Sequence, residues 1–528
     1  MRTVGEALVD LLVARGIDTI FGIPGVHTLS LYRGLARNDV RHVLVRHEQG
    51  AGFAADGWGR VTGRPGVCFL ITGPGVLNAA TAIAEATADS VPMLVVTTVN
   101  PPDGRGRSRG RLHEIGDQRA ALAPIARLVR RIEAPEDLAP AVAEAFTALA
   151  TGRPGPVVLE LPLPLIDAPA AEAAPGRAAH RPQPAAEDVA AAAALIDAAR
   201  LPVLVAGGGT VDAAAAVRRF AEVTGAIVLP TTAAKGVMPW EHPCHPGTIL
   251  KSPAAHALLR EADLVVLAGT ELGETDTWLE APLRLSGKVV RIDLDPGQLD
   301  ADHPATVAIL ADAGAALDAI TAACRTRRPP CADRVRALRA AYRAGLTPLE
   351  QKHAKVWDIV RAALPADGIV AADMTQLAYT GSYYFPSSCP RSWLHPVGFG
   401  TLGYALPAAI GAKLARPQRA VLAVLGDGGL QFTLTELGTA VEQRLALPVL
   451  LWNNDALGQI ALGMRERSIR EIGVYQTNPD FQAIARAYRC RGVRPDGPQA
   501  LLQALERALH TDHPTLIEVR EDDPWLTL

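Results

Sequence analysis

Short apolar runs that alternate with helical stretches limit the possible folds of this chain more than any other feature. In the first third, VRHVLVRH, GVCFLITG and PMLVVTTV are typical of strands, and EQGAGFAADGWGRVTG and LNAATAIAEATADS are typical of helices. The alternation returns with LPVLVAGGGT, AIVLPTT, DLVVLAGT and KVVRIDLDP, and again with GIVAADM, AVLAVLGDG, LPVLLWNND and PTLIEVRED. Such alternation forms parallel sheets with helices on both faces. We therefore predict an α/β fold of three doubly wound parallel-sheet domains.

The boundaries of these domains follow from composition. The run PVVLELPLPLID closes the first domain, 1–167, and an Ala- and Pro-rich stretch without periodicity, 168–188, is typical of a linker. We expect a central domain at 189–325, a second linker at 326–350 and a third domain at 351–528. The first and third domains do not look alike in composition, so we infer a repeat from topology alone.

Charge and cysteine usage exclude several classes of protein. The net charge of −3 provides no basic surface for nucleic acid. The six cysteines are scattered without a CxxC pair, which argues against a zinc site or disulfides and fits the cytoplasm. No signal peptide is expected, since Arg2, Glu6 and Asp10 lie in the first turns, and no apolar run reaches the roughly 18 residues of a membrane span.

The strongest local motif joins two strand ends. One apolar strand ends in Gly426-Asp427-Gly428-Gly429, a helix is expected to begin near Thr433 or Thr435, and the next strand ends at Asn453-Asn454. Parallel sheets bind ligands at this edge. The Asp427 carboxylate and the Asn454 amide oxygen suit Mg²⁺, and glycine N–H groups can approach a phosphate. A tight turn and a helix cap are the plain structural alternatives for the two motifs.

These residues resemble a known family. GDG followed by 24 residues and NN is the fingerprint of thiamine-diphosphate enzymes, and the whole chain resembles the acetolactate synthase, benzoylformate decarboxylase and pyruvate oxidase group. The resemblance implies a pyrimidine-binding first domain, a diphosphate-binding third domain and a central domain that carries FAD in some members. It also implies Mg²⁺ ligands and diphosphate contacts, namely Asp427, Asn454 and the Ala456 carbonyl for the metal, and Thr375, Gln376, Gly426, Gly428 and Gly429 for the diphosphate.

The segment RHEQGAGFAADG provides the second match to this family. Glu48 alone is typical of a solvated glutamate at a helix start. The resemblance implies instead that it shares a proton with N1′ of the aminopyrimidine and so favours the imine form of the 4′-amino group. It further implies that Leu402 wedges the cofactor into a V shape and that the Gly400 carbonyl accepts the 4′-amino hydrogen. It also implies contacts near the pyrimidine and substrate from Thr72, Gly73 and Asn78.

Three side chains are candidates for substrate contact. His113 falls where acetolactate synthases have a glutamine and pyruvate decarboxylases have part of a histidine pair, and His27 follows Val26, which aligns with a substrate-facing position. A loop histidine is usually polar surface, but the placement of His113 makes it the candidate proton donor or substrate contact, whereas His27 could equally be a packed or exposed loop histidine. Gln459 and Ile460 lie where pyruvate decarboxylases place a catalytic glutamate, so an acid is missing there. The chain also resembles 5-guanidino-2-oxopentanoate decarboxylases in FGIPGVHTLSLYRGL, LHEIGDQRA and GTELGETDTW. The resemblance implies a glutamate at position 459, which would suit a guanidinium group, so Gln459 argues against a cationic substrate.

The resemblance implies that a 2-oxo acid loses CO₂ and that the resulting enamine is either protonated to an aldehyde or ligated to a second carbonyl. A flavin-dependent 2-oxo acid oxidase is the first alternative, but GTELGETDTW replaces an RFDDR-like stretch of FAD-binding members, so FAD is not expected. A regulatory or nucleotide-binding protein with a purely structural GDG turn is the second. The resemblance also implies a homodimer or homotetramer in which Glu48 of one subunit serves Asp427 of another.

Overall fold

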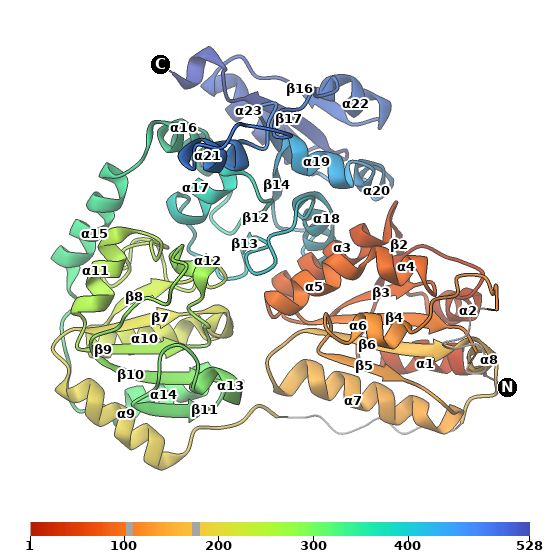
Figure 1. The fold of residues 1–528 in the computed structure, drawn as a ribbon, viewed down its shortest axis with the longest axis horizontal. Coiled ribbons are helices and arrows are strands. Elements are labelled where there is room, and N and C mark those ends of the chain that lie inside the picture. The colour runs from red at the N-terminus through yellow and green to blue at the C-terminus, as the bar shows by residue number, and fades with distance from the viewer. Residues whose placement is uncertain (1, 102–108, 172–179, 528) are drawn as a thin grey trace.

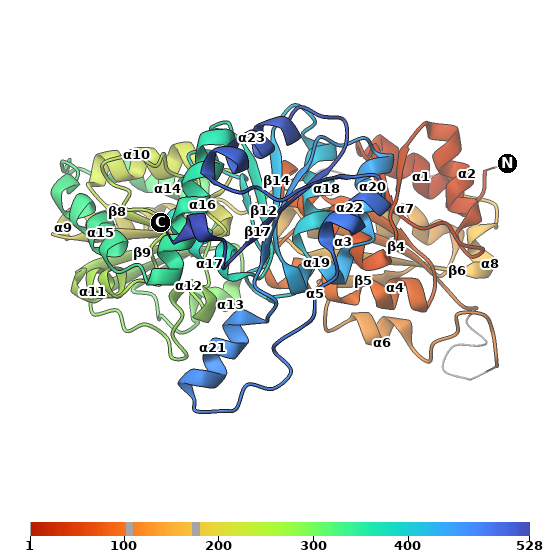
Figure 2. The same ribbon diagram turned by 90° about the horizontal axis from the view of Figure 1, so that it is seen from above.

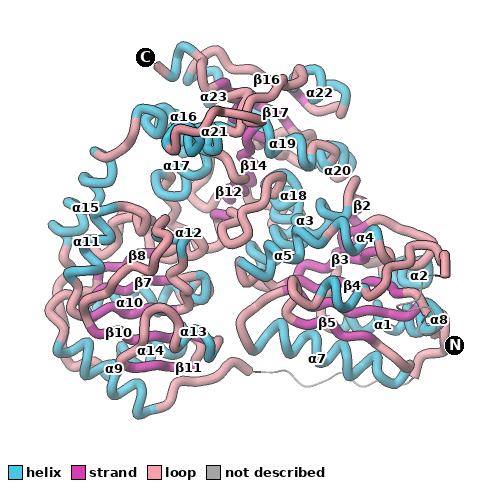
Figure 3. Tube along the Cα trace, viewed as in Figure 1, coloured by secondary structure: helices cyan, strands magenta, loops and turns pink. Residues whose placement is uncertain are grey.

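The computed structural model describes residues 2–101, 109–171 and 180–527 and shows three α/β domains arranged in an arc (Figure 1). The C-terminal domain lies between the other two. Each domain is built on a parallel sheet, as Figure 3 shows by the three groups of magenta strands. The three doubly wound domains predicted from the sequence are therefore confirmed.

The first domain has a six-stranded sheet. In spatial order its strands are β2 (Arg41–Leu44), β1 (Thr19–Gly22), β3 (Gly66–Leu70), β4 (Met93–Val99), β6 (Pro156–Pro162) and β5 (Leu128–Arg131). Its helices are α1 (Val4–Ala14), α2 (Leu29–Asn38), α3 (Glu48–Thr62), α4 (Pro74–Asn78), α5 (Ala80–Ala88), α6 (Gln118–Leu122), α7 (Leu138–Thr151) and α8 (Leu163–Ile166).

The C-terminal domain repeats the same strand order. Its strands are β13 (Trp393–Leu394), β12 (Ile369–Ala372), β14 (Val421–Gly426), β15 (Pro448–Asn453), β17 (Thr515–Arg520) and β16 (Arg491–Val493). Its helices are α16 (Pro348–Ala363), α17 (Gln376–Tyr384), α18 (Ala405–Ala415), α19 (Asp427–Thr433), α20 (Glu436–Glu442), α21 (Gly458–Glu466), α22 (Phe481–Ala487) and α23 (Pro498–Ala508). Both sheets have the order second, first, third, fourth, sixth, fifth, so the topological repeat is real.

The central domain has a five-stranded sheet. Its strands are β11 (Val307–Leu310), β10 (Lys288–Asp293), β9 (Leu264–Ala268), β7 (Pro202–Ala206) and β8 (Ile227–Pro230). Its helices are α9 (Ala186–Ala198), α10 (Ala214–Thr224), α11 (Pro253–Glu261), α12 (Glu274–Thr277), α13 (Pro296–Leu299), α14 (Ala313–Ala323) and α15 (Ala332–Ala344). Helix α15 lies within the expected linker 326–350, and Val335 and Leu338 bury one of its faces in the core of this domain. Residues 172–179 of the other expected linker lie outside the described residues, and the domain boundaries stay predictions.

Alternate residues of each strand point to opposite faces of its sheet. In β3, Val67 and Phe69 belong to one buried cluster and Cys68 and Leu70 to another. The cluster that contains Cys68 continues without a break into the C-terminal domain, where it includes Leu406 of α18. The first and third domains therefore share one hydrophobic core.

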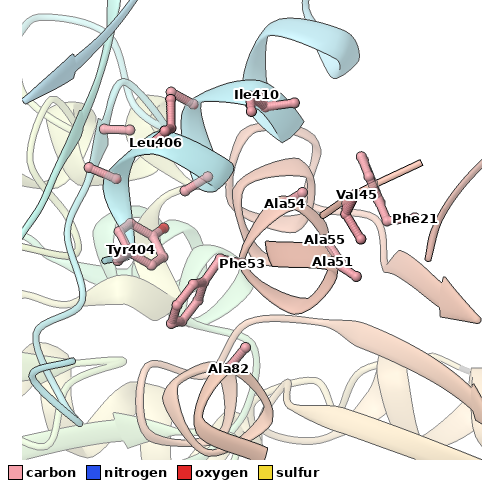
Figure 4. Packing of buried hydrophobic residues seen from close by; sticks show 14 of the residues in the cluster. Phe21, Val45, Ala51, Phe53, Ala54, Ala55, Ala82, Tyr404, Leu406 and Ile410 are labelled. Atoms are coloured by element: carbon pink, nitrogen blue, oxygen red, sulfur yellow. The ribbon is translucent and has the colours of Figure 1, made fainter. Parts of the chain in front are cut away.

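The centre of this shared core is the contact between α3 and α18, shown in Figure 4. Both helices carry the pattern Ala-Ala-x-Gly, at 54–57 in α3 and at 408–411 in α18. A Cβ on Gly57 would lie 2.1 Å from the carbonyl oxygen of Ala408, and a Cβ on Gly411 would lie 1.9 Å from that of Ala54. The contact is thus reciprocal, and each glycine lets the opposing backbone approach. This short pattern is a visible self-similarity that the sequence analysis overlooked.

Replacing Gly411 by alanine is expected to destabilise the protein by about 3 kcal/mol or more, because the new methyl group overlaps backbone rather than a flexible side chain. Helix propensity alone predicts the opposite sign, a gain of up to about 1 kcal/mol. The measurement is urea unfolding followed by circular dichroism. Gly463→Ala in α21 is the matched control, since its Cβ would meet only the end of the Arg467 side chain. Equal stability of the two variants would contradict the tight contact.

The helix expected near Thr433 or Thr435 is confirmed as α20, whose N-cap residue is Thr435, but a second helix precedes it, because α19 begins at Asp427 directly after the strand. The edge strands β5, β11, β13 and β16 were not foreseen. No helix in the described residues is long and apolar enough to cross a membrane, and the cellular location stays a prediction.

Candidate active site

The residues expected to contact a diphosphate lie together at the carboxyl ends of three neighbouring strands. β12, β14 and β15 are adjacent, and Gly426 is paired with Trp452, which places Asp427 beside the Asn453-Asn454 strand end. Thr375 directly precedes α17, and its Oγ1 would lie 3.1 Å from a Cβ on Gly426. We call these residues the diphosphate set: Thr375, Gln376, Gly426, Asp427, Gly428, Gly429, Asn454 and Ala456.

Side-chain amides connect the members of this set. Gln376 donates from Nε2 to Oε1 of Gln459 over 3.3 Å, and its own Oε1 is 3.5 Å from Nδ2 of Asn454. Between Asn454 and Ala456, Asp455 has a left-handed backbone with φ of 52°, a conformation that aspartate tolerates better than most residues. Arg520 donates to Oδ2 of Asp455 over 2.6 Å and stabilises this turn.

The donor set fits a magnesium ion. The Asp427 side chain is buried and is the only carboxylate of the three expected ligands, and the other two are an amide and a main-chain oxygen. Oxygen ligands with few carboxylates suit Mg²⁺ when phosphate oxygens complete the coordination. In the described residues no group of three or more His, Cys, Asp or Glu could hold a metal. That finding does not bear on a set with one carboxylate.

Two residues at this edge were missed by the sequence analysis. Asn478 donates from Nδ2 to Oδ2 of Asp427 over 2.6 Å and to Oδ1 of Asn453 over 3.0 Å, so it links the two strand ends. The buried Nε2 of Gln476 has no hydrogen-bond partner in the described part of the chain and would lie 3.6 Å from a Cβ on Gly428. An unpaired buried donor beside the glycines fits an anionic ligand such as a diphosphate.

The second group of predicted residues lies in the N-terminal domain, and we call Glu48, Thr72, Gly73 and Asn78 the pyrimidine set. Glu48 begins α3, is half-buried, and accepts a hydrogen bond at Oε2 from Nδ2 of Asn78 over 2.9 Å. Its other oxygen, Oε1, has no hydrogen-bond partner in the residues described. Gly73 has φ of 67°, and a Cβ there would lie 2.4 Å from the carbonyl oxygen of His113. Glycine is therefore required at that position.

The two candidate histidines lie together. The rings of His27 and His113 are 5.2 Å apart in an edge-to-face arrangement. Burial, and then the nearby His113, lowers the pKa of His27, which favours its neutral form. Gln118, missed from the sequence, is buried and accepts the Gly73 N–H over 2.9 Å. A lone glutamine in an amphipathic stretch gives no signal of such a role.

Gly400 and Leu402 lie in the loop between β13 and α18. Asp373, which follows β12, holds the end of this loop. It accepts hydrogen bonds from the N–H groups of Gly403, over 3.1 Å, and Ala405, over 3.3 Å. Thr433 donates to the Gly403 carbonyl over 2.7 Å. Burial raises the pKa of Asp373 to about 6. The loop is thus fixed next to the diphosphate set. Within the described residues of one chain, no hydrogen bond or ion pair links Glu48 or Asn78 to Asp427 or Asn454.

A separate cavity of about 260 Å³ lies where the three domains meet. It is lined by central-domain glycines Gly208, Gly209 and Gly269 and by Arg153 and Arg391, among others. Arg391 pairs with Asp212 over 2.7 Å, and Arg153 pairs with Glu271. Both arginines are therefore already neutralised by central-domain carboxylates.

The order of the three domains and the two residue sets define a thiamine-diphosphate enzyme. Family models agree: the N-terminal binding domain of thiamine pyrophosphate enzymes matches residues 2–121, the central domain matches 189–320, and the C-terminal binding domain matches 373–519. The chain belongs to this family, whose cofactor, thiamine pyrophosphate, is the same compound as thiamine diphosphate, and it is an enzyme of the decarboxylase and carboligase class.

Individual relatives narrow the comparison. The chain is 48% identical to a probable 2-ketoarginine decarboxylase, AruI, of Pseudomonas aeruginosa, over 98% of this chain and 94% of the relative. It is 34% identical to the acetolactate synthase isozyme 1 large subunit of Escherichia coli, with the same coverage. It is 30% identical to a probable acetolactate synthase large subunit of Methanocaldococcus jannaschii, over 97% of this chain and 91% of the relative. The resemblance predicted from the motifs is confirmed.

Proposed function

We propose that this enzyme decarboxylates a 2-oxo acid with thiamine diphosphate and Mg²⁺ and releases an aldehyde. The observation that carries the proposal is the meeting of Asp427, Asn454 and Ala456 at two adjacent strand ends, beside the unpaired amide of Gln476. The 48% identity to a probable 2-ketoarginine decarboxylase supports a decarboxylase, and makes 2-ketoarginine the first acid to test.

The residues of the diphosphate set would hold the cofactor and its metal. Asp427, Asn454 and the Ala456 carbonyl would bind Mg²⁺, and Thr375, Gln376 and the glycines of the GDGG turn would contact the diphosphate. Asn478 orients Asp427 through its 2.6 Å hydrogen bond, so that one carboxylate oxygen stays fixed. Bound thiamine diphosphate supplies the electron sink for loss of CO₂.

Glu48 is the proposed acid–base residue. Asn78 occupies Oε2, which leaves Oε1 free to hold and exchange a proton with the aminopyrimidine nitrogen. His113 is the proposed proton donor for the aldehyde, since Gln459 is not an acid, and the neutral His27 beside it is a proposed substrate contact. The hydrogen bond between Gln376 and Gln459 links the substrate end of the site to the diphosphate set.

The active enzyme is proposed to be a homodimer, or a tetramer of two such dimers, with sites between subunits. Large apolar side chains are exposed directly beside site residues in the sequence: Val26, Leu77 and Leu112 in the first domain, and Phe399, Ile460 and Tyr475 in the third. Apolar surface of this kind marks interaction sites. Figure 2 shows that α21, which carries Ile460, projects from the body of the chain. A second subunit would cover these residues and join one pyrimidine set to the other chain's diphosphate set.

The deciding experiment presents the purified enzyme, with thiamine diphosphate and Mg²⁺, with a panel of 2-oxo acids with and without a carbonyl acceptor, and scores products by mass spectrometry. The panel includes 2-ketoarginine, its neutral analogue with a urea group in place of the guanidinium, and pyruvate. An aldehyde from one acid supports the proposal. A ligated product would favour the second candidate function, a carboligase. The 34% identity to an acetolactate synthase supports this candidate. Preference for the neutral analogue would fit Gln459.

A flavin-dependent oxidase is the alternative with a visible signature. Two arginines that line the cavity between the domains, Arg153 and Arg391, are paired with Glu271 and Asp212, so neither is free to bind the phosphates of FAD. We therefore propose that the enzyme works without FAD. A purified protein with the absorption spectrum of a flavin would overturn this part of the proposal.

A further inference from the structure

A buried carboxylate of the C-terminal domain holds the chain just before Glu48. Oε1 of Glu436, in α20, accepts hydrogen bonds from the backbone N–H groups of Arg46, over 2.9 Å, and His47, over 3.0 Å. Its Oε2 accepts the hydroxyl of Thr439 over 2.6 Å. Burial raises the pKa of Glu436, and these hydrogen bonds oppose that shift. A Cβ on Gly50 would lie 2.4 Å from Oε1, so the carboxylate is pressed against the first turn of α3.

A carboxylate of the N-terminal domain likewise holds a segment of the C-terminal domain. Asp89, after α5, accepts the N–H of Val397 at Oδ2, over 3.0 Å, and the N–H of Gly398 at Oδ1, over 2.7 Å. Arg60 donates to Oδ2 of Asp89 over 2.7 Å and to the carbonyl of His395 over 3.1 Å. The segment so held leads directly to Gly400 and Leu402.

The two contacts are equivalent in kind. In each, one domain uses a carboxylate to bind two consecutive N–H groups of the other domain, just ahead of a proposed cofactor contact. The pyrimidine and diphosphate sets otherwise sit on separate sheets, and the placement of each depends on loops that a single domain would leave free. Misplacement of a reacting group by about 1 Å can cost roughly 100-fold in rate.

We infer that Glu436 and Asp89 are positioning residues: Glu436 fixes the backbone that presents Glu48, and Asp89 fixes the loop that presents Gly400 and Leu402. The inference rests on the proposed function for the roles of the residues they position. The geometry of the two contacts itself depends on no cofactor.

Glu436 and Asp89 should differ in how well they tolerate replacement by the corresponding amide, because they accept their hydrogen bonds on different numbers of oxygens. Both N–H groups held by Glu436 bind the same atom, Oε1, so glutamine can keep both bonds with its one carbonyl oxygen. The N–H groups held by Asp89 bind different oxygens, so asparagine must turn an NH₂ group towards one of them. Glu436→Gln should therefore be mild and Asp89→Asn severe, whereas alanine at either position should be severe.

The test compares these four variants with the wild type in two assays. Hydrogen exchange of the cofactor-free protein should be faster at Arg46 and His47 in Glu436→Ala, and at Val397 and Gly398 in Asp89→Ala. With cofactor, Glu436→Ala should lose about 100-fold in kcat with little change in KM, and Glu436→Gln should restore most of it.

Asp263→Ala is the matched control, because Asp263 also accepts two consecutive N–H groups, those of Arg200 and Leu201, in the central domain. It should lower stability and leave kcat unchanged. Unchanged exchange at Arg46 and His47 in Glu436→Ala would overturn the inference even if the chain shows no thiamine-diphosphate activity. Faster exchange with intact kcat would also overturn it and would leave the proposed function standing. If Glu436→Gln lowers kcat as much as Glu436→Ala does, then the acceptance of both N–H groups by the single oxygen Oε1 is not what positions Glu48.

Discussion

Replacing Glu48 by glutamine is expected to lower kcat by about 10²–10⁴-fold, the range for loss of a general acid–base group. Glutamine keeps the shape of the side chain and can still accept the hydrogen bond from Asn78, so the fold should be unchanged. What it loses is the ability to hold and exchange a proton at Oε1. The measurement is steady-state turnover of the acid found in the panel, with cofactor binding followed separately by calorimetry.

The control for this variant is Glu144→Gln on α7, which removes a carboxylate from an exposed ion pair with Arg130 of β5. Exposed pairs contribute about 1 kcal/mol or less, so this variant should behave like the wild type. Full activity in Glu48→Gln would contradict the proposed role. Loss of cofactor binding together with activity would mean that Glu48 holds the cofactor rather than exchanges its proton.

Replacing Asp427 by alanine is expected to abolish retention of thiamine diphosphate and Mg²⁺. The wild type should gain about 2.7 kcal/mol of stability when the cofactor is present at 100 times its dissociation constant, and the variant should gain nothing. The physical reason is that Asp427 is the only carboxylate among the three proposed metal ligands. The measurement is thermal unfolding with and without cofactor, and with excess EDTA added to the wild type.

This variant also leaves the amide of Asn478 without its 2.6 Å acceptor. Its stability without cofactor is therefore measured by urea unfolding, to separate a folding defect from a binding defect. Asp318→Ala, which breaks an exposed pair with Arg219, is the control. An Asp427→Ala protein that still purifies with cofactor would refute the metal site.

Mixing the two inactive variants tests the shared site directly. If Glu48 of one subunit serves Asp427 of the other, a mixed dimer contains one complete site, and random exchange should restore about a quarter of wild-type activity. If each chain supplies a whole site, the mixture should stay inactive. The result distinguishes the two arrangements without any structure of the assembly.

The long, central elements of this fold could be predicted from the sequence because their apolar residues follow a clear period. The edge strands β5, β11, β13 and β16 could not. β5, Leu128–Arg131, and β16, Arg491–Val493, are short and partly polar, because an edge strand has only one neighbour and more contact with water. The glycines of GDGG suggested a turn, yet α19 begins at Asp427, since helical backbone there is fixed by the strands and helices around it.

The residues of the candidate site also fall into those that the sequence predicts and those that it does not. Asp427, Asn454 and Glu48 belong to motifs whose spacing carries information, and they lie at strand and helix ends as expected. Glu436 and Asp89 could not be found, because a single acidic residue in or after a helix looks like surface. Each carboxylate is buried only because two domains that are far apart in sequence pack together, which places it against backbone N–H groups of the other domain.

The contact between α3 and α18 has a consequence for the origin of the molecule. Its two sides are the same helix in two copies of one topology, and the residues six positions before the two Ala-Ala pairs are Glu48 and Leu402. This is the isologous arrangement of a symmetric homodimer, held inside one polypeptide. It fits an ancestral dimer whose gene was duplicated and fused. In the proposed function, one copy supplies the proton-exchanging Glu48 and the other the residues that bind the diphosphate, while the contact between α3 and α18 keeps its symmetry.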